Sequence, residues 1–173
     1  MNCPSAYDYL LDTIMDKVDR AYLEHFIGSI CIDSYDYLPK YLIFYGPAGS
    51  GKTTLINMLI RLIGDGRVSY GTGMAKMAHS RFVVIHDGDA EKLIEETKDD
   101  PTTDGMTFII ATNKPVQDPP MSASILCMTG NRVPNVIFSE LIVPSLYEMT
   151  VPYKYYCIDS LCRYLKGEVN AEL

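Results

Sequence analysis

Gly46–Thr53, with the sequence GPAGSGKT, is a full match to the pattern GxxxxGK[ST]. An apolar run of strand length, Tyr41–Tyr45, precedes it, and Lys52–Ile63 has the apolar spacing of a helix. Between a strand and a helix, glycines let the backbone curl so that its N–H groups and the positive helix end meet phosphate oxygens. The stretch therefore predicts a phosphate-binding loop between a buried strand and a helix.

Such a loop binds a nucleoside triphosphate, and we expect ATP with Mg²⁺. Lys52 is expected to reach the β- and γ-phosphates and to be catalytic, while the Thr53 hydroxyl ligates Mg²⁺. The expected nucleotide-binding residues are Gly46, Pro47, Ala48, Gly49, Ser50, Gly51, Lys52, Thr53 and Thr54.

Polar side chains follow two further apolar runs. Asp87 and Asp89 come after Phe82–Ile85, and Asn113 comes after Phe108–Ala111. Because ligands of parallel sheets bind at the carboxyl ends of the strands, these residues are candidates for the same site. Asp87, nearest its strand, is the expected Mg²⁺ ligand and Asp89 the candidate for activating water, although the sequence leaves open which is the catalytic acid. Asn113 could hold the attacking water or a γ-phosphate oxygen, and solvated turns are the competing interpretation for all three.

Arg132 is predicted to lie at the tip of a hairpin. Two strands, Ser124–Met128 and Val136–Phe138, are expected around a turn over Gly130–Asn135. An arginine there is either solvated or offered to the nucleotide of a neighbouring subunit, where it would stabilise charge on the transferring phosphoryl group.

The alternation of apolar runs with helical patterns predicts an α/β fold, a three-layer sandwich with a mainly parallel sheet. The other predicted elements are helices over residues 6–28, 90–97 and 155–165 and a short strand over 68–70. We expect one domain over residues 1–173, with an N-terminal helical segment (1–39), an ATPase core (40–140) and a C-terminal segment (141–173).

Composition narrows the function classes. The net charge of −7 disfavours a dedicated nucleic-acid binder, which usually carries a basic patch. No apolar run is long enough to span a membrane, and the N-terminus lacks the basic start of a leader peptide. The five cysteines form no CxxC pair, which is typical of reduced thiols in an intracellular protein, in the cytoplasm or the nucleus.

The order of these motifs resembles the additional-strand P-loop ATPases. It is most similar to the ATPase domain of superfamily 3 helicases of DNA viruses, within the AAA+ class. The resemblance rests on Gly46–Thr53 as Walker A and Phe82–Asp87 as Walker B. It also rests on Ile109–Pro115, which contains Asn113 at the end of an apolar strand and matches motif C of that family. It implies a viral protein in a host cell, a homo-oligomer that can form a ring, single-stranded or duplex DNA as partner, and ATP hydrolysis. Arg132 is the candidate arginine finger.

Several features depart from that family. Walker B carries Asp87-Gly88-Asp89 rather than two adjacent acids, and the segment Glu91–Gly105 has six acidic residues where a DNA-gripping hairpin with a basic tip is expected. Two alternatives therefore stay open: a module that binds ATP without substantial turnover, and a small nucleotide kinase. The arginines are few and unclustered, which counts against a kinase lid.

Overall fold

One parallel sheet organises the chain in the computed structural model, which describes residues 2–36, 38–71, 80–86 and 88–168. Its strands run in the order β2-β3-β4-β1-β5, and every neighbouring pair is parallel. The strands are β1 (Tyr41–Tyr45), β2 (Val68–Tyr70), β3 (Phe82–Ile85), β4 (Thr107–Thr112) and β5 (Ala123–Cys127). The predicted strands at these places are confirmed, and β4 lies as an additional strand between β1 and β3.

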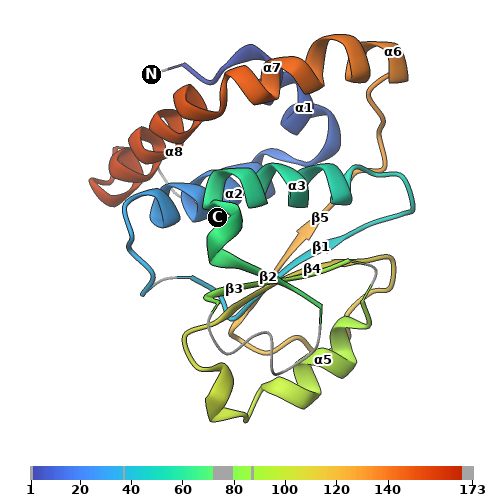
Figure 1. Ribbon diagram of the computed structural model, residues 1–173, viewed down its shortest axis with the longest axis vertical. Coiled ribbons are helices and arrows are strands. Elements are labelled where there is room, and N and C mark those ends of the chain that lie inside the picture. The colour runs from blue at the N-terminus through green and yellow to red at the C-terminus, as the bar shows by residue number, and fades with distance from the viewer. Residues whose placement is uncertain (1, 37, 72–79, 87, 169–173) are drawn as a thin grey trace.

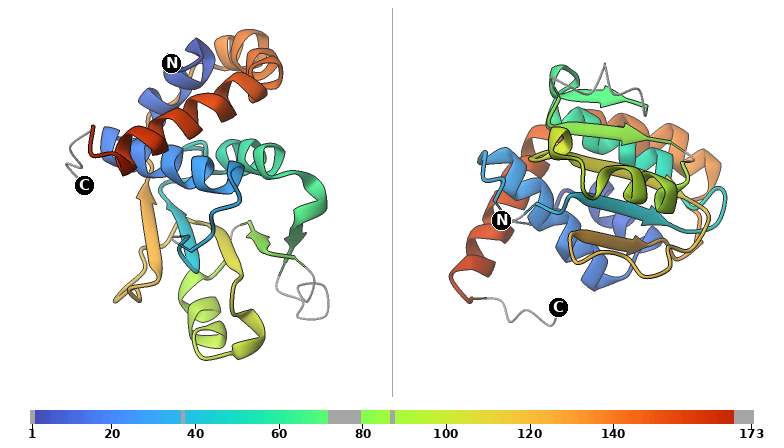
Figure 2. Two further views of the ribbon diagram at one scale, coloured as in Figure 1. Left: turned by 90° about the vertical axis from the view of Figure 1, so that its left-hand side faces the viewer. Right: turned by 90° about the horizontal axis from the view of Figure 1, so that it is seen from below.

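Helices cover both faces of the sheet and make a three-layer α/β sandwich of the P-loop NTPase kind. In Figure 1, α5 lies on one side of the sheet, while α1, α2, α3, α7 and α8 lie on the other. The helices are α1 (Ser5–Ile14), α2 (Lys17–Cys31), α3 (Lys52–Ile63), α5 (Ala90–Thr97), α6 (Asn135–Ile137), α7 (Val143–Glu148) and α8 (Thr150–Leu165), with a π-helical turn η3 (Phe138–Ile142) and 3-10 turns η1 (Asp65–Arg67) and η2 (Pro101–Thr103). The left view in Figure 2 shows the same layering from the side.

The central strands are buried on both faces, which explains their continuous apolar runs. In β1, Leu42 and Phe44 pack into the larger core under α1, α2, α3 and α8, while Tyr41 and Ile43 pack into the smaller core under α5. The sheet is thus fixed from both sides, and its carboxyl edge presents the loop that begins at Gly46.

The single helix predicted over residues 6–28 is wrong, because the chain forms two helices there. Met15 has an extended backbone and forms an antiparallel bridge with Met128, beside the end of β5. Asp16 then caps α2, its carboxylate accepting the N–H groups of Val18 and Asp19 at 2.9 Å each. A capping aspartate in an apolar-periodic segment is the physical reason for the break.

The predicted strand at Val136–Phe138 is also wrong, and so is the hairpin around Gly130–Asn135. The chain turns after β5 into α6, η3 and α7, which run along α1 and α3 (Figure 1). Pro134 starts this helical stretch, and Val136 is 65% exposed rather than packed on the sheet. A three-residue apolar run has no resolvable period, so its pattern could not separate strand from helix.

Gly28 sets how closely α2 and α8 approach each other. A Cβ atom there would lie 2.6 Å from the Cys157 carbonyl oxygen and 3.0 Å from the Leu161 Cβ. We expect Gly28→Ala to lower the free energy of unfolding by about 2 kcal/mol, because backbone atoms must move apart. The expected loss of Tm is about 4–8 °C. Gly66→Ala is the control, since no heavy atom lies within 4 Å of that Cβ position. Equal Tm values for the two variants would contradict the prediction.

Candidate functional site

The glycine-rich loop Gly46–Thr53 begins where β1 meets its neighbours at the carboxyl edge of the sheet. The Gly46 N–H donates to the Thr112 carbonyl at 3.3 Å, which joins the start of the loop to the end of β4. A Cβ on Gly46 would lie 2.6 Å from the Met128 Cβ, so the end of β5 closes on the loop as well. The loop is therefore held between β4 and β5 and has room only for glycine at its first position.

Two more glycines give the loop its curl. Gly49 has φ +75° and Gly51 has φ +95°, in the left-handed region that side chains disfavour. Gly51 is also the N-cap of α3, which begins at Lys52 and runs to Ile63 as predicted. The N–H groups of the first turn of α3 thus point into the loop, together with the positive end of the helix dipole.

Lys52 lies inside the curled loop, with 6% of its surface exposed. Its ammonium donates to the Gly46 and Pro47 carbonyls, each at 2.7 Å, and to the Ser50 hydroxyl at 3.4 Å. An ammonium group forms stronger hydrogen bonds with anionic oxygens than with neutral carbonyl groups. Thr53, the next residue, is exposed, so its hydroxyl is accessible for a metal ion. Thr54 is half-buried and borders a cavity next to the loop.

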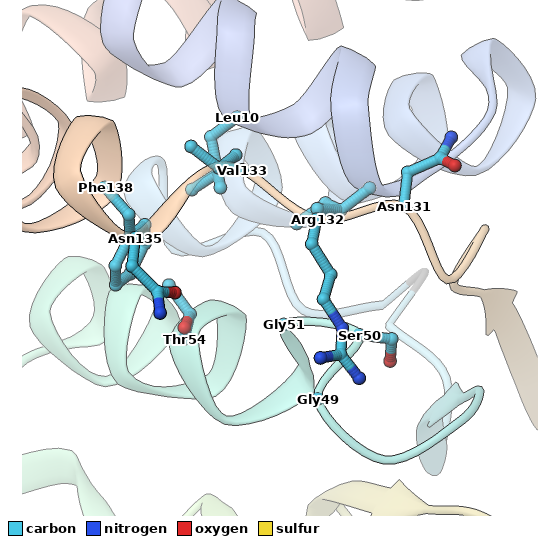
Figure 3. A pocket seen from close by; sticks show the side chains of 11 residues that line it. Leu10, Gly49, Ser50, Gly51, Thr54, Asn131, Arg132, Val133, Asn135 and Phe138 are labelled. Atoms are coloured by element: carbon cyan, nitrogen blue, oxygen red, sulfur yellow. The ribbon is translucent and has the colours of Figure 1, made fainter.

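That cavity has a volume of about 280 Å³ and continues the loop toward α1 and the start of α6 (Figure 3). One wall is apolar, and Asn135 points into the space from α6 toward Thr54. The lining residues are Leu10, Ile14, Gly49, Ser50, Gly51, Thr54, Asn131, Arg132, Val133, Asn135 and Phe138. Apolar walls with a few amide groups suit a flat heterocycle with polar edges, and the size is near the low end of small-ligand pockets, ~300–1,000 Å³.

Sequence reasoning missed most of this cavity, although it found the loop. Leu10 and Ile14 come from α1, and Val133 and Phe138 come from the segment after β5. In the sequence Leu10 and Ile14 are ordinary apolar positions of a helix, Val133 falls in a predicted turn and Phe138 in a predicted strand, and no local pattern relates them to the loop. Only the tertiary arrangement brings them to the loop.

Asn113 follows β4 and is exposed, one residue after the Thr112 carbonyl that accepts the Gly46 N–H. The Thr112 hydroxyl accepts the Lys114 N–H at 3.1 Å and so closes a tight turn with Asn113 at its tip. The end of β4 therefore lies beside the start of the glycine-rich loop. The catalytic role of Asn113 stays a prediction.

Asp89 is engaged as a helix cap. Its carboxylate accepts the Lys92 N–H at 3.2 Å at the start of α5 and pairs with the Lys114 ammonium at 3.5 Å. The Lys92 N–H, and then Lys114, lower the pKa of this carboxyl group. A carboxylate with both partners is well placed to stay ionised but is less free to take a proton from water. Asp87, the expected Mg²⁺ ligand, lies outside the described residues.

Arg132 lies over the loop of its own chain rather than at a hairpin tip. Its Nη2 donates to the Ala48 carbonyl at 3.1 Å, and Figure 3 shows the side chain reaching down to Gly49 and Ser50.

The acidic segment Glu91–Gly105 includes most of α5 and the turn that follows it. Its carboxylates face solvent or nearby loops.

Comparison with known proteins supports the fold alone. No family model matches the sequence, and no curated protein matches it. Among solved structures, the chain is similar to the NrS-1 C-terminal region in an A form apo structure, with a TM-score of 0.55, 15% identity, and coverage of 91% of this chain and 44% of that one. Another A form apo structure of that region gives a TM-score of 0.49 and 14% identity, with coverage of 85% and 45%. The chain thus spans less than half the length of the solved structures it resembles. No helix within the described ranges is long and apolar enough to cross a membrane.

Proposed function

We propose that this chain binds ATP with Mg²⁺ and hydrolyses it. The observation that carries the proposal is the curled loop with Lys52 buried inside it and a cavity at its end. Lys52, the positive-φ glycines and the N-terminus of α3 suit a triphosphate, and the cavity beside Thr54 suits the nucleoside.

The roles proposed for the remaining polar residues follow from their positions in the sequence, at the start of the helix after the loop or just after an apolar strand. The Thr53 hydroxyl is a ligand for Mg²⁺, which takes few protein ligands when phosphates supply the others. When bound, this ion polarises the phosphate oxygens and neutralises the charge that develops on them. Asn113 orients the attacking water or a γ-phosphate oxygen. Asp87 completes the metal site, and Asp89 is the alternative acid.

Nucleic acid is the proposed macromolecular partner, and a homo-oligomeric ring is the proposed assembly, both from the resemblance to superfamily 3 helicases. The acidic outer face of α5 would repel phosphates, so contact with DNA is expected elsewhere on the chain.

The second candidate function is nucleotide binding without substantial turnover. It is favoured by Asp89, whose carboxylate is already held by the Lys92 N–H and by Lys114. If Asp89 were the required base, these contacts would hinder proton transfer. A switch that binds and releases ATP needs the loop and the cavity but no such base.

The deciding experiment measures ATP binding and phosphate release by the purified chain, with Mg²⁺ or with a chelator. Both measurements are repeated in the presence of single-stranded DNA. We expect Mg²⁺-dependent binding and a turnover that rises with DNA. Binding without turnover in every condition would support the switch instead, and a chain that binds no ATP would refute both functions.

A further inference from the structure

Arg132 comes from a segment that is fixed against the rest of the site. After β5, the Thr129 N–H donates to the Ile14 carbonyl at 2.9 Å, and the Thr129 hydroxyl donates to the Thr13 carbonyl at 3.0 Å. The same hydroxyl accepts the Asn131 N–H at 3.2 Å. These bonds join the end of α1 to the residues just before Arg132, so the base of its side chain has a defined position.

The guanidinium of Arg132 packs closely on the phosphate-binding loop. Nη2 lies 3.1 Å from the Ala48 carbonyl oxygen, and a Cβ built on Gly49 would lie only 2.9 Å from Nη2 and 3.1 Å from Cζ. Gly49 therefore leaves the space that the guanidinium occupies. Arg132 also lines the same cavity as Ser50 and Thr54.

Charge sets Arg132 apart from the other arginines. Each of the other five has either a carboxylate or an aromatic ring as its partner, namely Arg20 with Asp8, Asp12 and Glu24, Arg67 with Asp33, Arg163 with Glu168, Arg61 with Tyr147, and Arg81 with Tyr35. Arg132 forms no ion pair with a carboxylate in the described part of the chain. Its hydrogen-bond partner is a backbone carbonyl, a weak acceptor compared with an anion.

We propose that Arg132 binds the phosphate chain of the nucleotide held by its own subunit, rather than serving a neighbouring one. The inference rests on the proposed function, because it assumes that the loop binds ATP. With a nucleotide present, the guanidinium exchanges the Ala48 carbonyl for phosphate oxygens, which its planar fork can bind in pairs. The contact would fasten the segment after β5, and with it α1, over the bound nucleotide.

The test compares ATP and ADP binding by wild type, Arg132→Ala and Arg132→Lys, using a fluorescent analogue of each nucleotide. We expect Arg132→Ala to weaken binding about 10- to 100-fold, as for a lost charged hydrogen bond, and Arg132→Lys to lie between it and wild type. Arg163→Ala is the matched control, since it removes one exposed arginine far from the loop, and its affinity should equal that of wild type.

A mixing experiment separates action within one chain from action on a neighbour. Arg132→Ala is mixed with Lys52→Ala, and phosphate release is measured. At low ATP, Arg132→Ala alone is expected to release little phosphate because it binds the nucleotide weakly. If Arg132 served a neighbouring subunit, a Lys52→Ala subunit would supply the missing arginine and this turnover would return. We expect no such return. Restored turnover, or wild-type affinity in Arg132→Ala, would overturn the inference. If the wild-type chain itself binds no nucleotide, that result refutes the proposed function, and the inference about Arg132 falls with it.

Discussion

Lys52→Ala is expected to weaken ATP binding about 100-fold, about 2.7 kcal/mol, and to abolish turnover. The Lys52 ammonium is buried in the curl of the loop, where a low dielectric strengthens its attraction for phosphate oxygens. Its two carbonyl partners, Gly46 and Pro47, lie in the loop itself, so the ammonium can turn from them to the ligand without moving a secondary-structure element. Titration with a fluorescent ATP analogue and a phosphate-release assay measure the two effects.

The same change removes the Lys52 donor from the Gly46 and Pro47 carbonyls, so the variant could also lose stability, although the Pro47 carbonyl keeps the Ser50 N–H at 3.2 Å. Lys52→Met keeps most of the side-chain volume and serves as a second variant. Thermal unfolding of both separates a misfolded loop from a folded loop that lacks its cation. Lys92→Ala is the matched control, because it removes an ammonium from α5 whose side chain is 74% exposed. Wild-type ATP affinity in both folded Lys52 variants would show that the loop is not the nucleotide site.

The sheet could be predicted from the sequence because its central strands are buried on both faces. A strand such as Phe82–Ile85 then has no polar position, and a short apolar run stands out between polar turns. The glycine-rich loop could also be predicted. Gly49 and Gly51 adopt left-handed backbone conformations, which glycine favours, so the sequence alone indicates where the loop curls. Local rules therefore predicted the sheet and the loop.

The rest of the site depends on contacts between distant parts of the chain, which local rules do not contain. The break at Met15 places Ile14 so that its Cδ1 is 3.5 Å from a Cβ position on Gly51, and a bridge to Met128 holds the break. Likewise, the helical path after Pro134 brings Phe138 to the cavity. Because a strand was predicted at Val136–Phe138, the sequence did not indicate that Phe138 lines the cavity, and it placed Arg132 at a hairpin tip.

A cluster of charges around Arg20 joins the three helices beside the site. Arg20, on α2, is only 12% exposed and pairs with Asp8 at 2.7 Å and with Asp12, both on α1. It also pairs with Glu24 at 2.9 Å, whose side chain is 6% exposed. The second oxygen of Glu24 accepts the Tyr156 hydroxyl of α8 at 3.1 Å. Removing Arg20 would leave the Glu24 carboxylate buried without a counter-charge.

Arg20→Met is therefore expected to lower the free energy of unfolding by about 3 kcal/mol, which corresponds to a Tm about 6–12 °C lower. Most of the loss comes from the stranded Glu24 carboxylate, so Arg20→Met combined with Glu24→Gln should recover more than half of it. Glu24→Gln alone is the matched control and should stay within about 1 kcal/mol of wild type, because its amide oxygen still accepts from Arg20. Chemical denaturation at neutral pH measures the free energy of unfolding of wild type, the two single variants and the double variant, which together form a double-mutant cycle.

The pH dependence of the same cycle gives an independent check. Burial raises the pKa of Glu24 above its usual 4.5, and Arg20 opposes that rise. A carboxyl group with a raised pKa binds its proton more tightly in the folded state, so its contribution to stability falls as pH rises from about 4.5 through the folded pKa. Without Arg20 the pKa of Glu24 rises further, and Arg20→Met should lose more stability between pH 5 and pH 8 than wild type does. The double variant, which has no carboxyl group at this position, should lose that extra dependence. An Arg20→Met protein whose deficit is the same at both pH values would mean that lost packing, and not the stranded carboxylate, causes the destabilisation.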